Sequence, residues 1–259
     1  MNMRCSVCGA KVRKWIFKPI ISDDLAKKWR LTENLRSKFD RRESQFCPIC
    51  KNSFRTRALA EAITKTIPYK NVSSLQEWQK HADKEGLKIA EINSCGNLHK
   101  TLKQIRGIAY SEYQLSLIDK NPVTTIKNII KKIVYQYKHE DITKLTYADN
   151  TFDLVLHSET LEHIISAEKA IKETKRILKP GGYCLFTVPI IPERRSVQRA
   201  DYGKTGNLIN LQDPSYHGFN NRTDYLVCWE FGRDFIQKYK LRTVVSYPDS
   251  AIWVFSIKK

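Results

Sequence analysis

The hydrophobic positions of this chain change their spacing near residue 87. From there on, short apolar runs alternate with segments whose apolar residues recur every three or four positions. The first pattern is typical of buried strands and the second of amphipathic helices. Strands are predicted at 87–92, 108–111, 133–137, 152–157 and 183–188, and helices at 97–104, 122–132 and 166–178. Their alternation predicts an α/β fold with a doubly wound, mostly parallel sheet covered by helices on both faces.

The C-terminal part of the chain follows a different pattern. A short helix is predicted at 235–239, followed by strands at 242–247 and 252–257 on either side of Pro248-Asp249-Ser250. A hairpin at this position would add one antiparallel strand to an otherwise parallel sheet. We therefore expect seven strands, with one antiparallel strand near the C-terminus.

The first seventy residues have no comparable alternation. A helix is predicted from Ser22, as its N-cap, to Leu31, and another at 57–66, which Pro68 ends. Residues 69–86 are expected to form a polar linker or a junction helix. We therefore predict a small module with a basic helical insert at 1–70. The main α/β domain is then 71–259, with a tail insertion at about 190–231.

Two cysteine pairs frame the insert of the N-terminal module. Cys5 and Cys8 form one Cys-x2-Cys knuckle, and Cys47 and Cys50 form the other. Four thiolates complete a tetrahedral site with no open position, so the spacing predicts structural Zn²⁺. An iron–sulfur site or a redox pair is the alternative. The other three cysteines, Cys95, Cys184 and Cys228, are isolated and are expected to be small buried hydrophobes.

The charge of the chain is strongly positive and uneven. Its 259 residues carry a net charge of +18 with a pI near 9.6, and residues 1–70 hold 17 basic and 6 acidic residues. Such a surface suits RNA, but it is equally compatible with a solvated lysine-rich face. No apolar run is long enough to span a membrane, and the first residues do not resemble a secretory signal. A cytoplasmic location, with reduced thiols, is the default expectation.

The most informative motif series lies in residues 152–189. A strand, Phe152–Ser158, leads to Leu161-Glu162-His163, and a helix leads to Leu178-Lys179-Pro180-Gly181-Gly182 and Phe186–Pro189. This order resembles the fourth-to-fifth-strand segment of class I S-adenosylmethionine-dependent methyltransferases. Ligands of open α/β sheets bind outside the carboxyl ends of the strands. Because the loop after this strand lies there, Leu156, His157 and Ser158 are expected to face the cofactor or the acceptor.

The resemblance implies a set of residues that bind S-adenosylmethionine. Glu91 occupies the acidic position of the first strand, and the loop after it keeps a single glycine. Glu112, 21 residues later, is expected to accept hydrogen bonds from the ribose hydroxyls. Asp141 would bind the adenine amino group, and Ile142 would pack on the ring. The full predicted set is Glu91, Cys95, Gly96, Glu112, Asp141, Ile142 and His157.

Transfer of a methyl group to a hydroxyl requires a base, and histidine is the most frequent one. His157 and His217 are the predicted candidates, and His163 is available as well. The chain has no Asn/Asp-Pro-Pro-Tyr loop of the kind found in enzymes that methylate base amines. Cys184, inside a predicted strand, is badly placed to be the nucleophile that pyrimidine C5 methylation needs.

Several short motifs together resemble bacterial methyltransferases of glycan and natural-product biosynthesis. These are the two knuckles, Arg42-Glu43, Arg55, Arg57, Ser111-Glu112-Tyr113, Leu161-Glu162-His163 and Tyr216-His217-Gly218. The resemblance implies O-methylation of a sugar, a glycan or another small molecule. An RNA methyltransferase guided by the basic module is the alternative. A degenerate fold that only binds ligands is the third reading, and the glycine-poor first loop is its support.

Overall fold

The computed structural model describes residues 3–113, 138–216 and 225–259. The predicted helix at 122–132 and the predicted strand at 133–137 lie outside these ranges. The helices are α1 (Asp23–Lys28), α2 (Glu33–Ser44), α3 (Phe54–Thr66), α4 (Leu75–Lys84), α5 (His99–Leu102), α7 (Ala167–Ile177) and α8 (Phe235–Lys238), with 3₁₀ turns at Gly96–Leu98, Leu161–His163 and Pro248–Ser250.

The main strands are β5 (Ile89–Ile92), β6 (Ala109–Glu112), β7 (Lys138–His139), β8 (Phe152–Ser158), β9 (Leu178–Thr187), β15 (Arg242–Tyr247) and β16 (Ile252–Lys258). They form one sheet in the order β15-β16-β9-β8-β5-β6-β7. Within the described sheet, β16 runs antiparallel to both of its neighbours, and every other neighbouring pair is parallel. The predicted α/β class, the seven-strand sheet and its single antiparallel strand near the C-terminus are confirmed.

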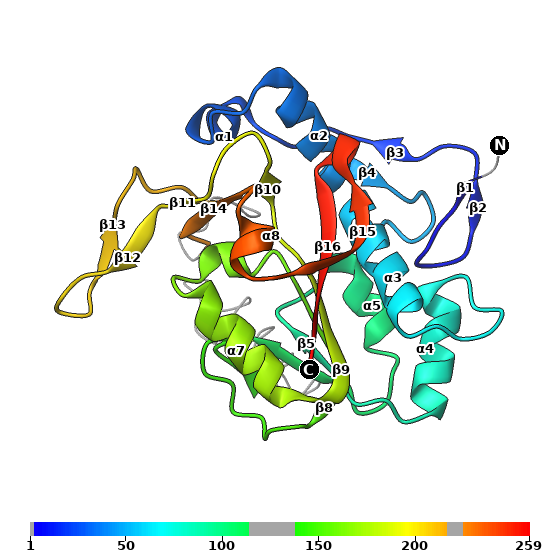
Figure 1. Ribbon diagram of the computed structural model, residues 1–259. Coiled ribbons are helices and arrows are strands. Elements are labelled where there is room, and N and C mark those ends of the chain that lie inside the picture. Colours follow the sequence, from blue (N-terminus) through cyan, green and yellow to red (C-terminus); the bar gives the residue numbers. More distant parts are fainter. Residues whose placement is uncertain (1–2, 114–137, 217–224) are drawn as a thin grey trace, which may run out of the picture.

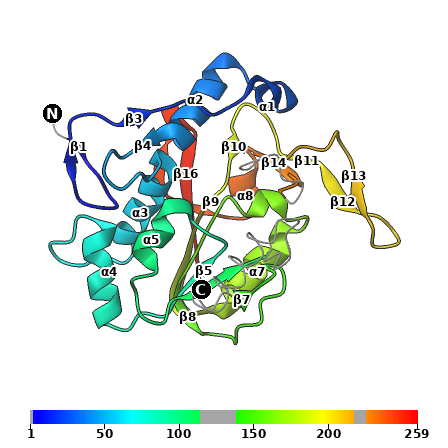
Figure 2. The same cartoon turned by 180° about the vertical axis from the view of Figure 1, so that it is seen from behind.

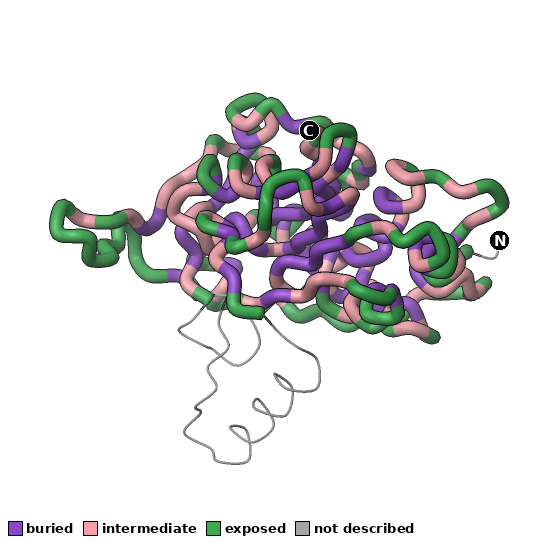
Figure 3. The backbone as a smooth tube through the Cα atoms, turned by 90° about the horizontal axis from the view of Figure 1, so that it is seen from below, coloured by how far each residue is buried: buried purple, intermediate pink, exposed green. Residues whose placement is uncertain are grey.

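Helices cover both faces of this sheet, as Figures 1 and 2 show from opposite sides. The central strand β8 explains why, because successive side chains of a strand point to opposite faces. Leu154 and Leu156 pack with α3, α4 and α5, whereas Val155 packs with α7 and α8. Two apolar cores therefore lie on either side of one buried sheet, shown in purple at the centre of Figure 3.

The N-terminal segment packs directly on this sheet. Ser53 caps α3, which contacts β15, β16 and β9. Cys5 and Cys47 belong to the same apolar core as Leu154 and Leu185. The N-terminal segment also contains two antiparallel pairs of short strands. They are β1 (Met3–Arg4) with β2 (Lys11–Val12), and β3 (Ile16–Phe17) with β4 (Gln45–Phe46). The boundary near residue 70 stays a prediction, and the packing is continuous across it.

Some element bounds differ from the expectation. Helix α1 has the predicted Ser22 cap but ends at Lys28, and α2 follows it without having been predicted. The segment 69–86 contains α4, which agrees with the junction helix that was one of its two expected forms. Strand β9 begins at Leu178, opposite Phe152, so that the Lys-Pro-Gly-Gly turn forms a bulge inside the strand. Hydrogen bonds between this turn and Lys259 hold the bulge in place.

The tail between β9 and β15 builds a small cap. Strand β14 (Trp229–Gly232) pairs with β10 (Ile190–Ile191) and β11 (Val197–Gln198). Gly232 is needed there, because a Cβ atom would lie 2.2 Å from the Arg194 carbonyl oxygen. Strands β12 (Ala200–Tyr202) and β13 (Leu208–Asn210) form a hairpin that projects from the body (Figures 1 and 3). Among the described helices, none combines the length and the apolar character needed to cross a membrane.

Candidate active site

A cavity of about 1270 Å³ opens at the carboxyl ends of β5, β6, β7 and β8. The loops that follow these strands supply its floor, including Asn93, Tyr113, Thr143 and Thr160. The N-terminal insert and the tail supply its walls. The position agrees with the rule that ligands of open α/β sheets bind outside the carboxyl ends of the strands.

The loop after β5 keeps a tight turn although it contains one glycine. Gly96 has φ +65° and lines the cavity, and Asn93 adopts φ +57°, which asparagine tolerates better than most residues. The Asn93 side chain accepts a hydrogen bond from the Tyr113 amide at 3.0 Å, which ties this loop to the end of β6. Asn93 therefore takes a left-handed position that would otherwise favour glycine.

Two predicted residues support this loop from beneath. Glu91 is fully buried and does not line the cavity. Its carboxylate accepts a hydrogen bond from the Cys95 amide at 2.8 Å and lies 2.6 Å from His99 Nδ1. Cys95 is also fully buried and does not line the cavity, although its neighbours Ser94 and Gly96 do. Both residues shape the loop, and neither presents its side chain to the cavity.

The next two strands present their acidic residues to the cavity, as expected. Glu112 lines it and is hydrogen-bonded to the Tyr110 hydroxyl, and burial raises the pKa of this carboxyl. Asp141 also lines it and accepts hydrogen bonds from the Thr143 amide and hydroxyl, both at 2.8 Å. Ile142 is buried in the core behind Asp141 and is not part of the lining.

The three candidate histidines have different positions. His157 is buried and stacks on Phe186 with 4.6 Å between ring centroids, and it does not line the cavity. Burial lowers the pKa of His157 to about 3. This histidine is a neutral packing residue, because its position in β8 directs it into the core beneath α7 and α8. His217 lies outside the described residues.

His163 lines the cavity, with its Nε2 3.9 Å from Glu162 Oε1. Its Nδ1 lies 2.8 Å from the Leu226 carbonyl oxygen, which can only accept, so Nδ1 is the donor. The neutral ring consequently carries its lone pair on Nε2. Burial lowers the pKa of His163, which favours the neutral form near pH 7. Of the three candidates, His163 is the one that the described structure brings to the cavity.

Two arginines at the cavity and their two carboxylate partners were not assigned to the site from sequence. Arg42, only 2% exposed, donates to both carboxylate oxygens of Glu159, at 2.7 and 2.6 Å. Arg55 binds Glu43 at 2.9 and 3.1 Å and also contacts Ser158. The only signal in the sequence was the position of the two arginines, each five residues from the second cysteine knuckle.

The four knuckle cysteines come together, as predicted. Their sulfur atoms all lie within 4.8 Å of one another, with Cys5 and Cys50 3.7 Å apart and Cys8 and Cys47 3.9 Å apart. A tetrahedral zinc ion with Zn–S bonds of about 2.3 Å requires sulfur atoms roughly 3.8 Å apart. Both knuckles also turn alike, because Gly9 and Lys51, each directly after the second cysteine, adopt positive φ. The residues present fit a structural metal.

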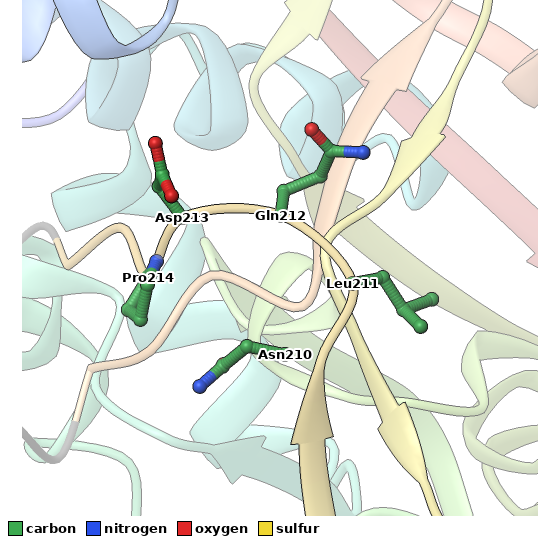
Figure 4. A pocket seen from close by; sticks show the side chains of 5 residues that line it. All are labelled: Asn210, Leu211, Gln212, Asp213 and Pro214. Carbon is green, nitrogen blue, oxygen red and sulfur yellow. The ribbon is translucent and has the colours of Figure 1, made fainter.

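A second hollow lies on the tail and is lined by Asn210, Leu211, Gln212, Asp213 and Pro214 (Figure 4). These five residues are consecutive, and their side chains point in different directions rather than toward one point. This arrangement does not form a constellation of groups that could carry out a reaction.

Comparison with known families agrees with the position of the cavity. Residues 92–186 match a family model described as a methyltransferase domain. The match runs from the end of β5, through the floor of the cavity, to β9. The match covers 95 of the 259 residues.

Individual relatives cover parts of the chain. It is 43% identical over 99 residues to a ubiquinone/menaquinone biosynthesis C-methyltransferase of Hydrogenovibrio crunogenus. The aligned part covers 36% of this chain and 38% of that protein. It is 30% identical over 142 residues to a demethylmenaquinone methyltransferase of Staphylococcus epidermidis. The aligned part covers 47% of this chain and 56% of that protein. The chain thus spans about half the length of these relatives or less.

Among solved structures, an S-adenosylmethionine-dependent methyltransferase from Mesorhizobium loti covers 71% of this chain and 98% of its own. Its sequence identity to this chain is 14%, and the TM-score is 0.39.

Proposed function

We propose that this protein transfers a methyl group from S-adenosylmethionine to a hydroxyl group of a small molecule bound in the large cavity. One observation supports this most directly: the cavity lies on the strand ends of the matched methyltransferase domain, with Glu112, Asp141 and His163 in its lining. S-adenosylmethionine supplies a methyl group activated by a positively charged sulfur.

The lining suits a positively charged donor. Its charged residues are five acidic ones, Glu43, Glu112, Asp141, Glu159 and Asp201, and three basic ones, Arg42, Arg55 and Lys169. We assign the donor to the end formed by Gly96, Glu112 and Asp141. A Cβ atom on Gly96 would have only the Thr56 methyl group within 4 Å, so the loop leaves room for a ligand.

His163 acts as the base in this proposal. Its Nε2 takes the hydroxyl proton while the acceptor oxygen bonds to the methyl carbon and the bond from that carbon to sulfur breaks. The hydrogen bond from Nδ1 to the Leu226 carbonyl holds the ring in one tautomer and stabilises it once it becomes charged. A base positioned in this way increases the reaction rate by a factor of about 10² to 10⁴.

The charges of the cavity lining also bear on the kind of acceptor that we propose. An acid-rich cavity repels a polyanion, so the RNA alternative draws no support from the described residues. Methylation of a sugar or glycan stays a prediction. The degenerate alternative loses its main argument, because Asn93 gives the glycine-poor loop its left-handed turn.

We also propose that the four-cysteine cluster binds one structural Zn²⁺. The closed set of four sulfurs and the matching turns of the two knuckles support this role. The ion would join both ends of the insert formed by residues 9–46, and so fix the part of the chain that builds one wall of the cavity.

The test of the enzymatic proposal is an assay for S-adenosylhomocysteine release with acceptor panels of phenols, nucleotide sugars and RNA fragments. We expect turnover with a hydroxyl-bearing small molecule, and a kcat at least about 10²-fold lower in His163→Asn. His81→Asn, a change at an exposed histidine of α4, is the matched control. Turnover on RNA alone, or full activity of His163→Asn, would contradict the proposal.

A further inference from the structure

The cavity is larger than one ligand needs, and its two ends differ in chemistry. Pockets for one drug-sized ligand usually measure about 300–1,000 Å³, whereas this one measures about 1270 Å³. The end at the strand tips is polar, with Asn93, Ser94, Glu112 and Asp141. The other end lies against the N-terminal insert and is lined mainly by apolar side chains.

The apolar wall comes from a single short segment between the cysteine pairs. Its six lining residues are Ile20, Ile21, Leu25, Trp29, Leu31 and Phe39. Trp29 and Phe39 pack edge to face, with ring centroids 6.3 Å apart. The indole N–H of Trp29 already donates to Ser215 Oγ at 2.9 Å. The ring therefore offers the cavity only apolar surface.

Further apolar lining residues come from the segments after β8 and β9 and from the tail. They are Ile164, Ile165, Pro189 and Leu226. The Cys228 amide donates to the Glu162 carbonyl at 2.7 Å, which joins the tail to the segment after β8. Arg194 donates to the Trp29 carbonyl at 2.8 Å, which joins the tail to the insert. The two apolar walls are thus fixed relative to each other.

The cations at this end are engaged within the protein. Arg42 is bound by Glu159, and Arg55 is bound by Glu43. Lys169 is the remaining cation among the described lining residues, and it lies at the exposed start of α7. A diphosphate, as in a nucleotide sugar, needs several available cations or amides. The walls instead match a hydrocarbon surface.

We infer that the acceptor carries an extended apolar body, aliphatic or aromatic, which lies against residues 20–39 and places its hydroxyl group at His163. This inference rests on the proposed function and specifies its substrate class. The apolar body supplies binding energy through burial. Because Arg42 and Arg55 are already paired with carboxylates, they offer an anionic competitor no available cation.

The first experiment uses the intact zinc-loaded protein and the neutral fluorophore N-phenyl-1-naphthylamine, with S-adenosylhomocysteine present. We expect saturable binding of the fluorophore. 4-Alkylphenols should displace it, with affinity rising about fourfold for each added methylene. Displacement by UDP-glucose but not by alkylphenols, or affinity independent of chain length, would overturn the inference.

A variant pair locates the site. Leu25→Gln places a polar group in the apolar wall and should weaken fluorophore binding about tenfold. Lys27→Gln, on the exposed side of the same helix, should leave it unchanged. Equal affinity of both folded variants would overturn the placement. Titration with S-adenosylmethionine separates the two claims. Absence of donor binding would reject the proposed function, whereas donor binding without fluorophore binding would reject only the apolar acceptor.

Discussion

Arg42 and Glu159, 117 residues apart in the chain, form a two-point ion pair at the base of the cavity, with N–O distances of 2.7 and 2.6 Å. Glu159 follows β8 directly and has φ +53°, a left-handed conformation that a non-glycine residue adopts only when its surroundings hold it. The ion pair therefore connects the N-terminal insert to the loop expected to face the reacting groups.

Removal of Glu159 should cost considerable stability. Glu159→Ala leaves the nearly buried Arg42 with Glu43 as its remaining carboxylate partner, and breaking a buried pair on one side costs about 3 kcal/mol. Urea denaturation measures this loss in the free energy of unfolding. Glu168→Ala, at an exposed carboxylate of α7, should change it by less than about 0.5 kcal/mol. Equal losses in the free energy of unfolding of the two variants would show that the ion pair does not stabilise the fold.

Metal analysis should find one zinc ion per chain. Cys47→Ser removes one of four ligands, so we expect loss of bound zinc and a fall in Tm of about 10 °C, because metal binding contributes directly to folding. Cys184→Ala, a change at a buried thiol in β9 away from the cluster, should keep one zinc ion. Iron, or a full complement of zinc in Cys47→Ser, would refute the structural zinc site.

Stability should depend on pH through His157. Its pKa is about 3 in the folded protein, whereas an unfolded histidine titrates near 6.5. The unfolded state therefore binds the extra proton first. The contribution of His157 to stability is fully present above pH 6.5 and falls by about 2 to 3 kcal/mol by pH 4.5.

Urea denaturation of His157→Phe at several pH values isolates this effect, because phenylalanine can still stack on Phe186. We expect the stability of this variant to decline less than that of the wild type between pH 6.5 and 4.5. His81→Gln should retain the wild-type slope. Identical slopes for His157→Phe and the wild type would show that His157 is not held neutral.

The central strands of the sheet, such as β5 and β8, were predictable because they are buried on both faces and are therefore short apolar runs. Helix α2 was not, because its sequence is mostly polar and only Leu35 and Phe39 contribute apolar groups to its buried side. The local hydrophobic pattern thus predicted the central strands that end at the cavity. It did not predict the helix that helps to form the cavity wall.

At the site too, some side-chain positions were predictable from the sequence and others were not. Glu112 was predictable from the end of its strand, and the family resemblance implied Asp141; both residues line the cavity. The choice among histidines was not, since both His157 and His163 follow the start of β8 closely. The strand directs His157 into the core, and the 3₁₀ turn at Leu161–His163 brings His163 to the cavity. The Arg42–Glu159 contact depends on tertiary packing that no local spacing reveals.

Calorimetric titration of the zinc-loaded protein with S-adenosylmethionine tests the central claim most directly. We predict one binding site per chain, weakened about tenfold or more in Glu112→Ala, because a carboxylate hydrogen bond to a ligand contributes about 1.5–3 kcal/mol. Glu168→Ala should bind like the wild type. Absence of any binding heat and of any thermal stabilisation in the folded wild-type protein would contradict the account.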